Sequence, residues 1–233
     1  MFCAIIGDIV ESRKIYNSAM DSKINDPERH ALQEKLNKIL DHINKKYASD
    51  IITPFAIGYG DDFEGIVKPT CCFLEIAMRI IRTIYPVKIR FAFGFGNMRT
   101  IPDNRIVFQS DGPAMYYARD ALNQMKNCKN NTGLINMIFT TNEENVFMNS
   151  SLLINALFDL LTIITNNWTE NQLKIVWATE DYEGSKGKQM KAAKQLGITA
   201  PAISESLKKS NYAVYRKVWT ALINYFELIT INM

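Results

Sequence analysis

The stretch Gln189–Lys209, QMKAAKQLGITAPAISESLKK, carries the clearest structural signal in the sequence. Gly197 permits a tight turn between two helices, because glycine adopts the left-handed conformation without strain. Ala193, four residues earlier, is small enough for the two helices to cross closely. Thr199 is a typical N-cap for a helix over Ala200–Lys209. The pattern therefore predicts a helix-turn-helix.

Apolar residues in this stretch are spaced to hold the second helix against the first: Leu196, Ile198, Ile203 and Leu207. The outward positions of the second helix are small or polar and include no arginine, the side chain that most often reads guanine. They are Thr199, Ala200, Ala202, Ser204, Glu205 and Lys208. The lysines placed for phosphate contacts are Lys186, Lys188, Lys191, Lys194 and Lys209. A helical hairpin that docks on the rest of the chain or on a partner protein is the alternative.

The stretch resembles the helix-turn-helix of the fourth region of sigma factors and related regulators, in which the second helix enters the major groove of DNA. The resemblance implies DNA as a partner. It implies contacts from Lys188, Lys191, Thr199, Ala200, Ser204 and Lys208.

Charge is distributed unevenly along the chain. Residues 1–167 contain 18 Lys or Arg and 18 Asp or Glu, whereas residues 168–233 contain 9 and 6. The entire positive excess therefore lies in the last quarter, which favours a polyanion partner there. Because this excess is small for a solitary DNA-binding protein, we expect a homodimer.

Aromatic residues flank the helix-turn-helix on both sides, from Trp168 to Phe226. At this spacing they are typical of the core of a small helical domain, which we favour over base stacking. The last apolar stretch, Val214–Leu228, would close this core or form a dimer seam. Its shared helical face consists of Val214, Val218, Leu222 and Tyr225.

The first part of the chain alternates strand and helix patterns. Short apolar runs predict strands at Phe2–Ile9, Ile51–Tyr59, Phe63–Val67, Val87–Gly96 and Leu134–Thr140. Helical spacing predicts helices at Pro27–Tyr47, Pro69–Ile84 and Gly112–Met125, the last with Asp111 as N-cap. This order is that of a split βαβ unit, an antiparallel sheet with a central first strand and helices on one face.

The expected fold class is α+β, with an antiparallel sheet and helices followed by an all-α helix-turn-helix domain. We place an α+β domain at residues 1–142, a helical connector at 143–167 and the helix-turn-helix domain at 168–233. Within the connector, Leu152–Thr165 is too short and too polar to span a bilayer and is predicted to be a buried helix.

Cysteines occur at positions 3, 71, 72 and 128, without the spacing of a zinc site. We interpret them as small apolar residues of a reducing compartment, with a redox pair at 71 and 72 as the alternative. The first ten residues lack the basic region of a signal peptide. We therefore expect a cytoplasmic protein with no membrane partner.

Two acids lie at chemically suggestive places. Asp8 follows Gly7 at the end of the first predicted strand, and Asp61 follows Gly60 in the hairpin GYGDDF. If the first strand lies beside the hairpin, the two carboxylates meet at one edge and offer oxygen ligands suited to Mg²⁺ or Mn²⁺. The alternative is ordinary turn chemistry, for which Asp and Gly are common.

Four segments resemble, in order, those of the nucleotidyl cyclases, a superfamily that includes the diguanylate cyclases. They are AIIGDIVESRK at residues 4–14, AIGYGDDFEGI at 56–66, KIRFAFGFG at 88–96 and DGPAMYYARDAL at 111–122. The resemblance implies a ferredoxin-like, cyclase-like sheet and covers roughly residues 3–125. The whole chain also resembles the bacterial SatD family, which joins such a module to a C-terminal helix-turn-helix.

The cyclase resemblance implies roles for particular residues. Asp8 and Asp61 match the metal-binding acids, and Arg119 matches the arginine that stabilises the transition state. The implied nucleotide contacts are Gly7, Ile9 and Gly60. Met115 stands where the cyclases have an asparagine, and it cannot orient a ribose by hydrogen bonding. The alternative for Arg119 is a surface ion pair with Asp120 or Asp111.

Three hypotheses follow. The first is a regulator whose cyclase-like domain binds a nucleotide or related anion with a divalent metal, and whose helix-turn-helix binds DNA. The second is a metal-dependent nucleotidyl cyclase or nucleotidyltransferase with a protein-docking tail. The third is an interaction protein without chemistry. Met115 disfavours the second, and the retained Asp8, Asp61 and Arg119 disfavour the third. The first, a nucleotide sensor rather than an enzyme, is therefore preferred.

Overall fold

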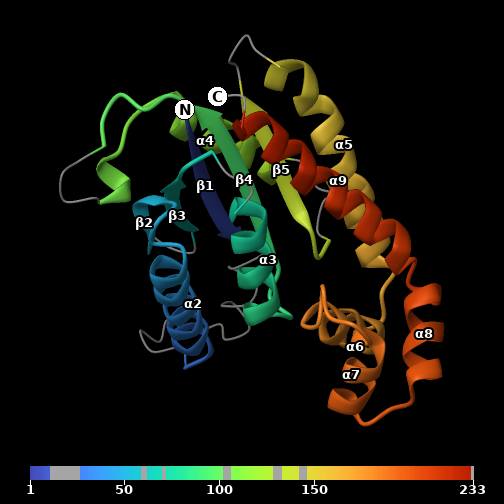
Figure 1. The fold of residues 1–233 in the computed structure, drawn as a ribbon. Helices are drawn as coiled ribbons and strands as arrows, with labels where there is room; N and C mark the ends of the chain where they lie inside the picture. The colour runs from blue at the N-terminus through green and yellow to red at the C-terminus, as the bar shows by residue number, and fades with distance from the viewer. Residues whose placement is uncertain are drawn as a thin grey trace.

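In the computed structural model, five strands form one sheet in the order β2-β3-β1-β4-β5 (Figure 1). The structure describes residues 1–10, 27–58, 62–69, 72–101, 106–127, 133–141 and 146–231. The strands are β1 Phe2–Ile9, β2 Ile51–Ile57, β3 Asp62–Val67, β4 Ile89–Gly96 and β5 Asn136–Thr141. The predicted mixture of a sheet with helices, an α+β fold, is therefore confirmed.

β1 lies at the centre of the sheet, as predicted. It pairs antiparallel with β3 on one side and with β4 on the other. Residues 3–10 are all buried, which explains why this strand is a nearly continuous apolar run rather than an alternating one. The buried thiol of Cys3 fits the core role expected of it, and burial raises the pKa of that thiol.

The expectation of an antiparallel sheet with helices on one face is only partly right. β5 pairs parallel with β4, and the connecting helix α4, Pro113–Asn127, covers the opposite face from the other helices. Two neighbouring parallel strands need a crossover, and α4 supplies it. The crossover packs closely, because a Cβ on Gly94 would lie 2.1 Å from the carbonyl oxygen of Ala114.

The other face of the sheet carries the larger core. It is covered by α2 Pro27–Lys46, α3 Cys72–Ile84, α5 Val146–Asn166 and α9 Tyr212–Ile231. A short 3₁₀ helix, Val107–Gln109, precedes α4. α4 itself begins at Pro113, so Gly112 and not Asp111 occupies the position before its first residue. No helix in the described part of the chain is long and apolar enough to cross a membrane.

The C-terminal helices are α6 Glu170–Glu180, α7 Lys188–Leu196, α8 Ala200–Lys209 and α9. α9 first packs with the other C-terminal helices and then runs along α5 back to the sheet (Figure 1). Near its end, the ring of Phe226 contacts those of Phe73, Phe95 and Phe139. The aromatic residues of this region are core residues, as predicted, including Tyr212, Tyr215 and Trp219.

Two expectations about buried helix faces are wrong. Val214 is 48% exposed, so the buried stripe of α9 runs through Tyr215, Trp219, Leu222 and Phe226 instead. α5, predicted to be buried, is buried on one side only, and Leu152 is 84% exposed. A helix on the outside of a sheet has one face against the strands, and apolar composition alone does not show whether a second layer covers the other.

Candidate functional site

Asp8 ends β1 in a cluster of charged groups. Its backbone lies opposite Asp62 of β3 on one side and Arg90 of β4 on the other. The Asp8 carboxylate is 12% exposed, with Oδ2 3.0 Å from Nη1 of Arg90 and Oδ1 2.8 Å from Nζ of Lys126 on α4. The sequence predicted Asp8 as a site residue but neither Arg90 nor Lys126.

Three carboxylates share the face of the sheet that α4 covers. The register pairs Asp8 with Asp62 and Ile6 with Glu64, and alternate residues of a strand face the same way. Ile6 packs against α4, which places Asp8, Asp62 and Glu64 on that face. The Oδ1 atom of Asp62 is buried and has no hydrogen-bond partner among the described residues. Such an oxygen, on the same face of the sheet as Asp8, fits a cation ligand.

Arg119 pairs with Glu64, a residue that the sequence did not predict as part of the site. Nη2 of Arg119 lies 3.4 Å from Oε2 of Glu64, so the alternative of an ion pair with Asp120 or Asp111 is wrong. The Asp111 carboxylate instead accepts a hydrogen bond from the Tyr116 hydroxyl. Burial raises the pKa of Glu64, and the attraction of Arg119 offsets this only in part. Glu64 on β3 and Arg119 on α4 are 55 residues apart in the sequence, so no local signal connects them.

The other residues implied by the cyclase resemblance are placed as follows. Gly7 and Ile9 alternate with Asp8 and belong to the opposite face of the sheet, where Ile9 is buried. A Cβ on Gly7 would clash with the ring of Phe63, which gives this glycine a packing role. Gly60 and Asp61 lie outside the described residues, so the geometry of the predicted Asp8–Asp61 pair stays a prediction. In the described ranges, no group of three metal-ligating side chains is positioned to hold an ion.

The helix-turn-helix forms as the sequence predicts. α7 ends at Leu196 and is followed by Gly197, whose φ of 67° is left-handed. The Thr199 side chain accepts a hydrogen bond from the Ala202 amide at 3.3 Å. Ala193 is buried at the crossing. α8 buries Ile203 and Leu207 against its neighbours, whereas Ile198 is 39% exposed and does not contribute to the buried face as expected. Ile198 lies in the turn before α8 begins, so the helical periodicity that buries Ile203 and Leu207 does not apply to it.

The outward face of α8 is open to solvent at the positions expected to read DNA. Thr199, Ser204 and Lys208 are exposed, and Ala200 is half-buried. Several predicted phosphate contacts already have partners in the chain. Lys188 lies 3.0 Å from Glu183, Lys209 lies 2.7 Å from Glu205, and Lys191 lies over the ring of Tyr182. These pairs are at the surface and exchange readily, because exposed ion pairs contribute little free energy.

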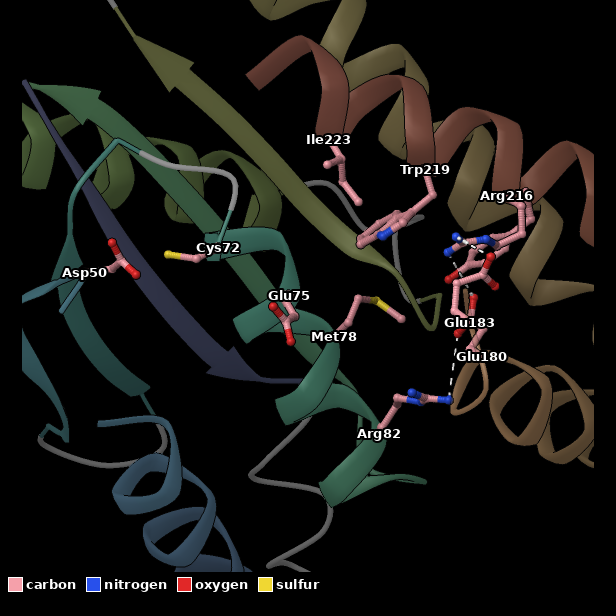
Figure 2. A pocket seen from close by; sticks show the side chains of 11 residues that line it. Asp50, Cys72, Glu75, Met78, Arg82, Glu180, Glu183, Arg216, Trp219 and Ile223 are labelled. Carbon is pink, nitrogen blue, oxygen red and sulfur yellow. Dashed lines mark ion pairs between the residues drawn. The ribbon is translucent and has the colours of Figure 1, made fainter. Parts of the chain in front are cut away.

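A cavity of about 560 Å³ lies where the C-terminal helices meet the sheet (Figure 2). Figure 2 shows Met78 and Arg82 of α3 facing Trp219 and Arg216 of α9, with Glu180 of α6 at one end. Glu180 lies 3.8 Å from Arg82 and 3.7 Å from Arg216, and burial raises its pKa against the attraction of both. Arg82 also donates to the Trp177 carbonyl at 2.7 Å. This charged joint, which the sequence did not predict, ties the sheet to the helix-turn-helix.

The fold and sites define a class of protein: a mixed α+β sheet with a charged, acid-rich end, joined to a C-terminal helix-turn-helix. A comparison with protein-family models finds one for the SatD family that matches residues 2–225. The chain therefore belongs to the SatD family. No curated protein and no solved structure matches it.

Proposed function

We propose that this chain is a bacterial regulatory protein that binds DNA through α7 and α8. In the same proposal, the sheet part binds a nucleotide or related anion together with Mg²⁺ or Mn²⁺. The observation that carries the DNA proposal is the geometry of α8. Its inner face is fixed by Ile203 and Leu207, and its outer face from Thr199 to Lys208 is solvent-exposed. A helix held this way can enter a major groove without rearrangement.

The sheet supports the second part of the proposal. Without β5, the strand order β2-β3-β1-β4 has all neighbours antiparallel, which supports a ferredoxin-like, cyclase-like arrangement. The orphaned Asp62 oxygen, on the same face of the sheet as Asp8, fits a divalent cation. Lys126 and Arg119 are about half exposed and able to reach phosphate oxygens. When a phosphate and a cation bind, the acids and bases that now pair with one another would exchange partners.

The DNA proposal is tested by gel shift with the region upstream of the chain's own gene. We expect Lys191→Ala combined with Lys208→Ala to weaken retention, and the slope of log affinity against log salt to fall by about 2 for two lost phosphate contacts. Lys217→Ala, an exposed lysine on α9, is the matched control and should leave both unchanged. Retention that the double variant does not alter would contradict a role for this face.

The anion proposal is tested by thermal unfolding with each nucleoside triphosphate and Mg²⁺. We expect at least one triphosphate to raise the melting temperature, and Asp8→Asn with Asp62→Asn to abolish that shift. Asp120→Asn, an exposed acid on α4, is the control and should keep it. A shift that survives in the double variant would leave the acids as structural residues.

A metal-dependent nucleotidyl cyclase or nucleotidyltransferase is the second candidate, favoured by the shared face of Asp8, Asp62 and Arg119. Met115 disfavours it, because its side chain is buried between α4 and the sheet and offers no polar group to a ribose. Release of pyrophosphate from any triphosphate with Mn²⁺ would support this candidate, and no release from all four would exclude it.

A further inference from the structure

α5 has a second apolar face, which no described residue covers. Its inner face packs against the sheet through Ile154, Phe158 and Leu161. On its outer side, Leu153 and Ile163 are each 61% exposed and Leu160 is 38% exposed. Single exposed apolar side chains are common, whereas a group of large ones on one face of a surface helix is typical of an interaction surface.

The outer side chains follow a heptad pattern. Leu153, Ala156, Leu160 and Ile163 are separated by three, four and three residues, the alternation at which one helix packs along another. The spacing reads the same from either end. Two copies of α5 lying antiparallel about a twofold axis at residue 158 therefore place Leu153 opposite the partner's Ile163. They also place the small Ala156 opposite the partner's Leu160, so that a large side chain meets a small one.

Charge disfavours other occupants of this face. α5 contains no lysine or arginine, and Asp159 is its one charged residue from Val146 to Asn166. Helices that lie on a membrane surface carry basic residues on the polar face, and nucleic-acid surfaces are basic. A charge-poor, self-complementary seam instead fits another copy of itself.

We propose that α5 is the dimer interface of this protein and that the seam Leu153, Ala156, Leu160 and Ile163 pairs antiparallel with the same seam of a second copy. The pairing does not depend on DNA or nucleotide binding. A seam from one 21-residue helix is expected to bury less than the roughly 800 Å² per partner of a standard complex, so we expect a weak dimer with a dissociation constant of micromolar order. Asp159 flanks the seam and faces the partner's Asp159, which weakens the dimer.

The test is sedimentation equilibrium of the full chain without DNA or nucleotide, from about 1 to 300 μM to span a micromolar constant. The wild type should change from the 26.6 kDa chain to twice that mass. Leu153→Lys and Ile163→Glu should each weaken the dimer by roughly 100-fold, because each buries an unpaired charge. Asp159→Asn should strengthen it severalfold at low salt. Val214→Lys, on the exposed face of α9, is the control and should change nothing.

Mixing the two charged variants tests the antiparallel register. In a heterodimer, the lysine introduced by Leu153→Lys in one chain lies opposite the glutamate introduced by Ile163→Glu in the other. The second Leu153–Ile163 contact stays intact, so the mixture should dimerise more tightly than either variant alone. Recovery on mixing also shows that both variants are folded. A wild type that is monomeric throughout, a dimer unaffected by the α5 variants, or a mixture that does not recover would each overturn the proposal.

Discussion

The helix-turn-helix and the acid-rich end of the sheet differ in how far apart their parts are in the sequence. Every determinant of the turn lies within Gln189–Lys209, and the left-handed Gly197 and the Thr199 cap act on their nearest neighbours. The sheet end combines Asp8, Asp62–Glu64, Arg90 and residues 119–126 of α4. A site built from local rules is predictable from sequence, whereas a site built across strands is found only in part.

The two regions also differ in electrostatics. At the sheet end, the charged groups of Asp8, Arg90 and Glu64 are largely buried and each has a charged partner, so a substitution of one leaves its partner unpaired. On α7 and α8 the charges are exposed and their pairs are weak. We therefore expect substitutions to affect stability strongly in the sheet part and at the joint, and weakly on the helix-turn-helix surface.

The largest effect should come from the contact that ties α9 to the sheet. Phe226→Ala removes a ring that packs against Phe73, Phe95 and Phe139, and should lower the free energy of unfolding by about 3–5 kcal/mol. Urea denaturation measures the loss. Leu228→Ala, at a position 63% exposed, should cost less than about 0.5 kcal/mol. Equal effects of the two substitutions would mean that α9 does not anchor there.

The next effect tests the pairing at the sheet end. Asp8→Asn should cost about 2–3 kcal/mol, because the Arg90 guanidinium, 15% exposed, loses its charged partner. The comparison variant is Asp120→Asn, whose carboxylate is exposed and should be nearly neutral. If urea denaturation finds Asp8→Asn equally neutral, the buried charge cluster is not a stabilising feature of the fold.

A smaller effect is expected in the helix-turn-helix. Thr199→Ala removes the cap that accepts from the Ala202 amide, and should lower the free energy of unfolding by about 1 kcal/mol. Thr220→Ala, on the exposed face of α9, should leave stability unchanged or slightly higher, because alanine favours helix. Denaturation curves that coincide for the two variants would argue that the cap is not formed in solution.

The smallest effect is a pH dependence at Glu64. Burial raises the pKa of this carboxyl from its ordinary value of 4.5, so the folded protein binds the proton more tightly than the unfolded chain. Glu64 therefore makes its best contribution to stability below pH 4.5, and that contribution is lost as pH rises through the higher folded pKa. Glu64→Gln should remove this loss. Its stability relative to the wild type should increase from pH 4.5 to about 7, and a constant difference would contradict the shift.

Local sequence rules determined much of this protein. The central apolar strand, the bounds of α8, the left-handed glycine and the Thr199 cap follow from residue types within a few positions, and the structure has them where the sequence predicts. The charge imbalance and the aromatic core of the C-terminal helices also follow from the sequence. These features depend on backbone preference and helical periodicity, which act over short separations.

Only the tertiary structure decided which distant groups meet. It paired Asp8 with Arg90 and Lys126, joined Glu64 to Arg119, and put α4 on the opposite face of the sheet. It also left one side of α5 exposed, although its composition predicted burial. The physical reason is that strand register and the crossover bring together residues far apart in the chain, and no single segment encodes what covers its outer face.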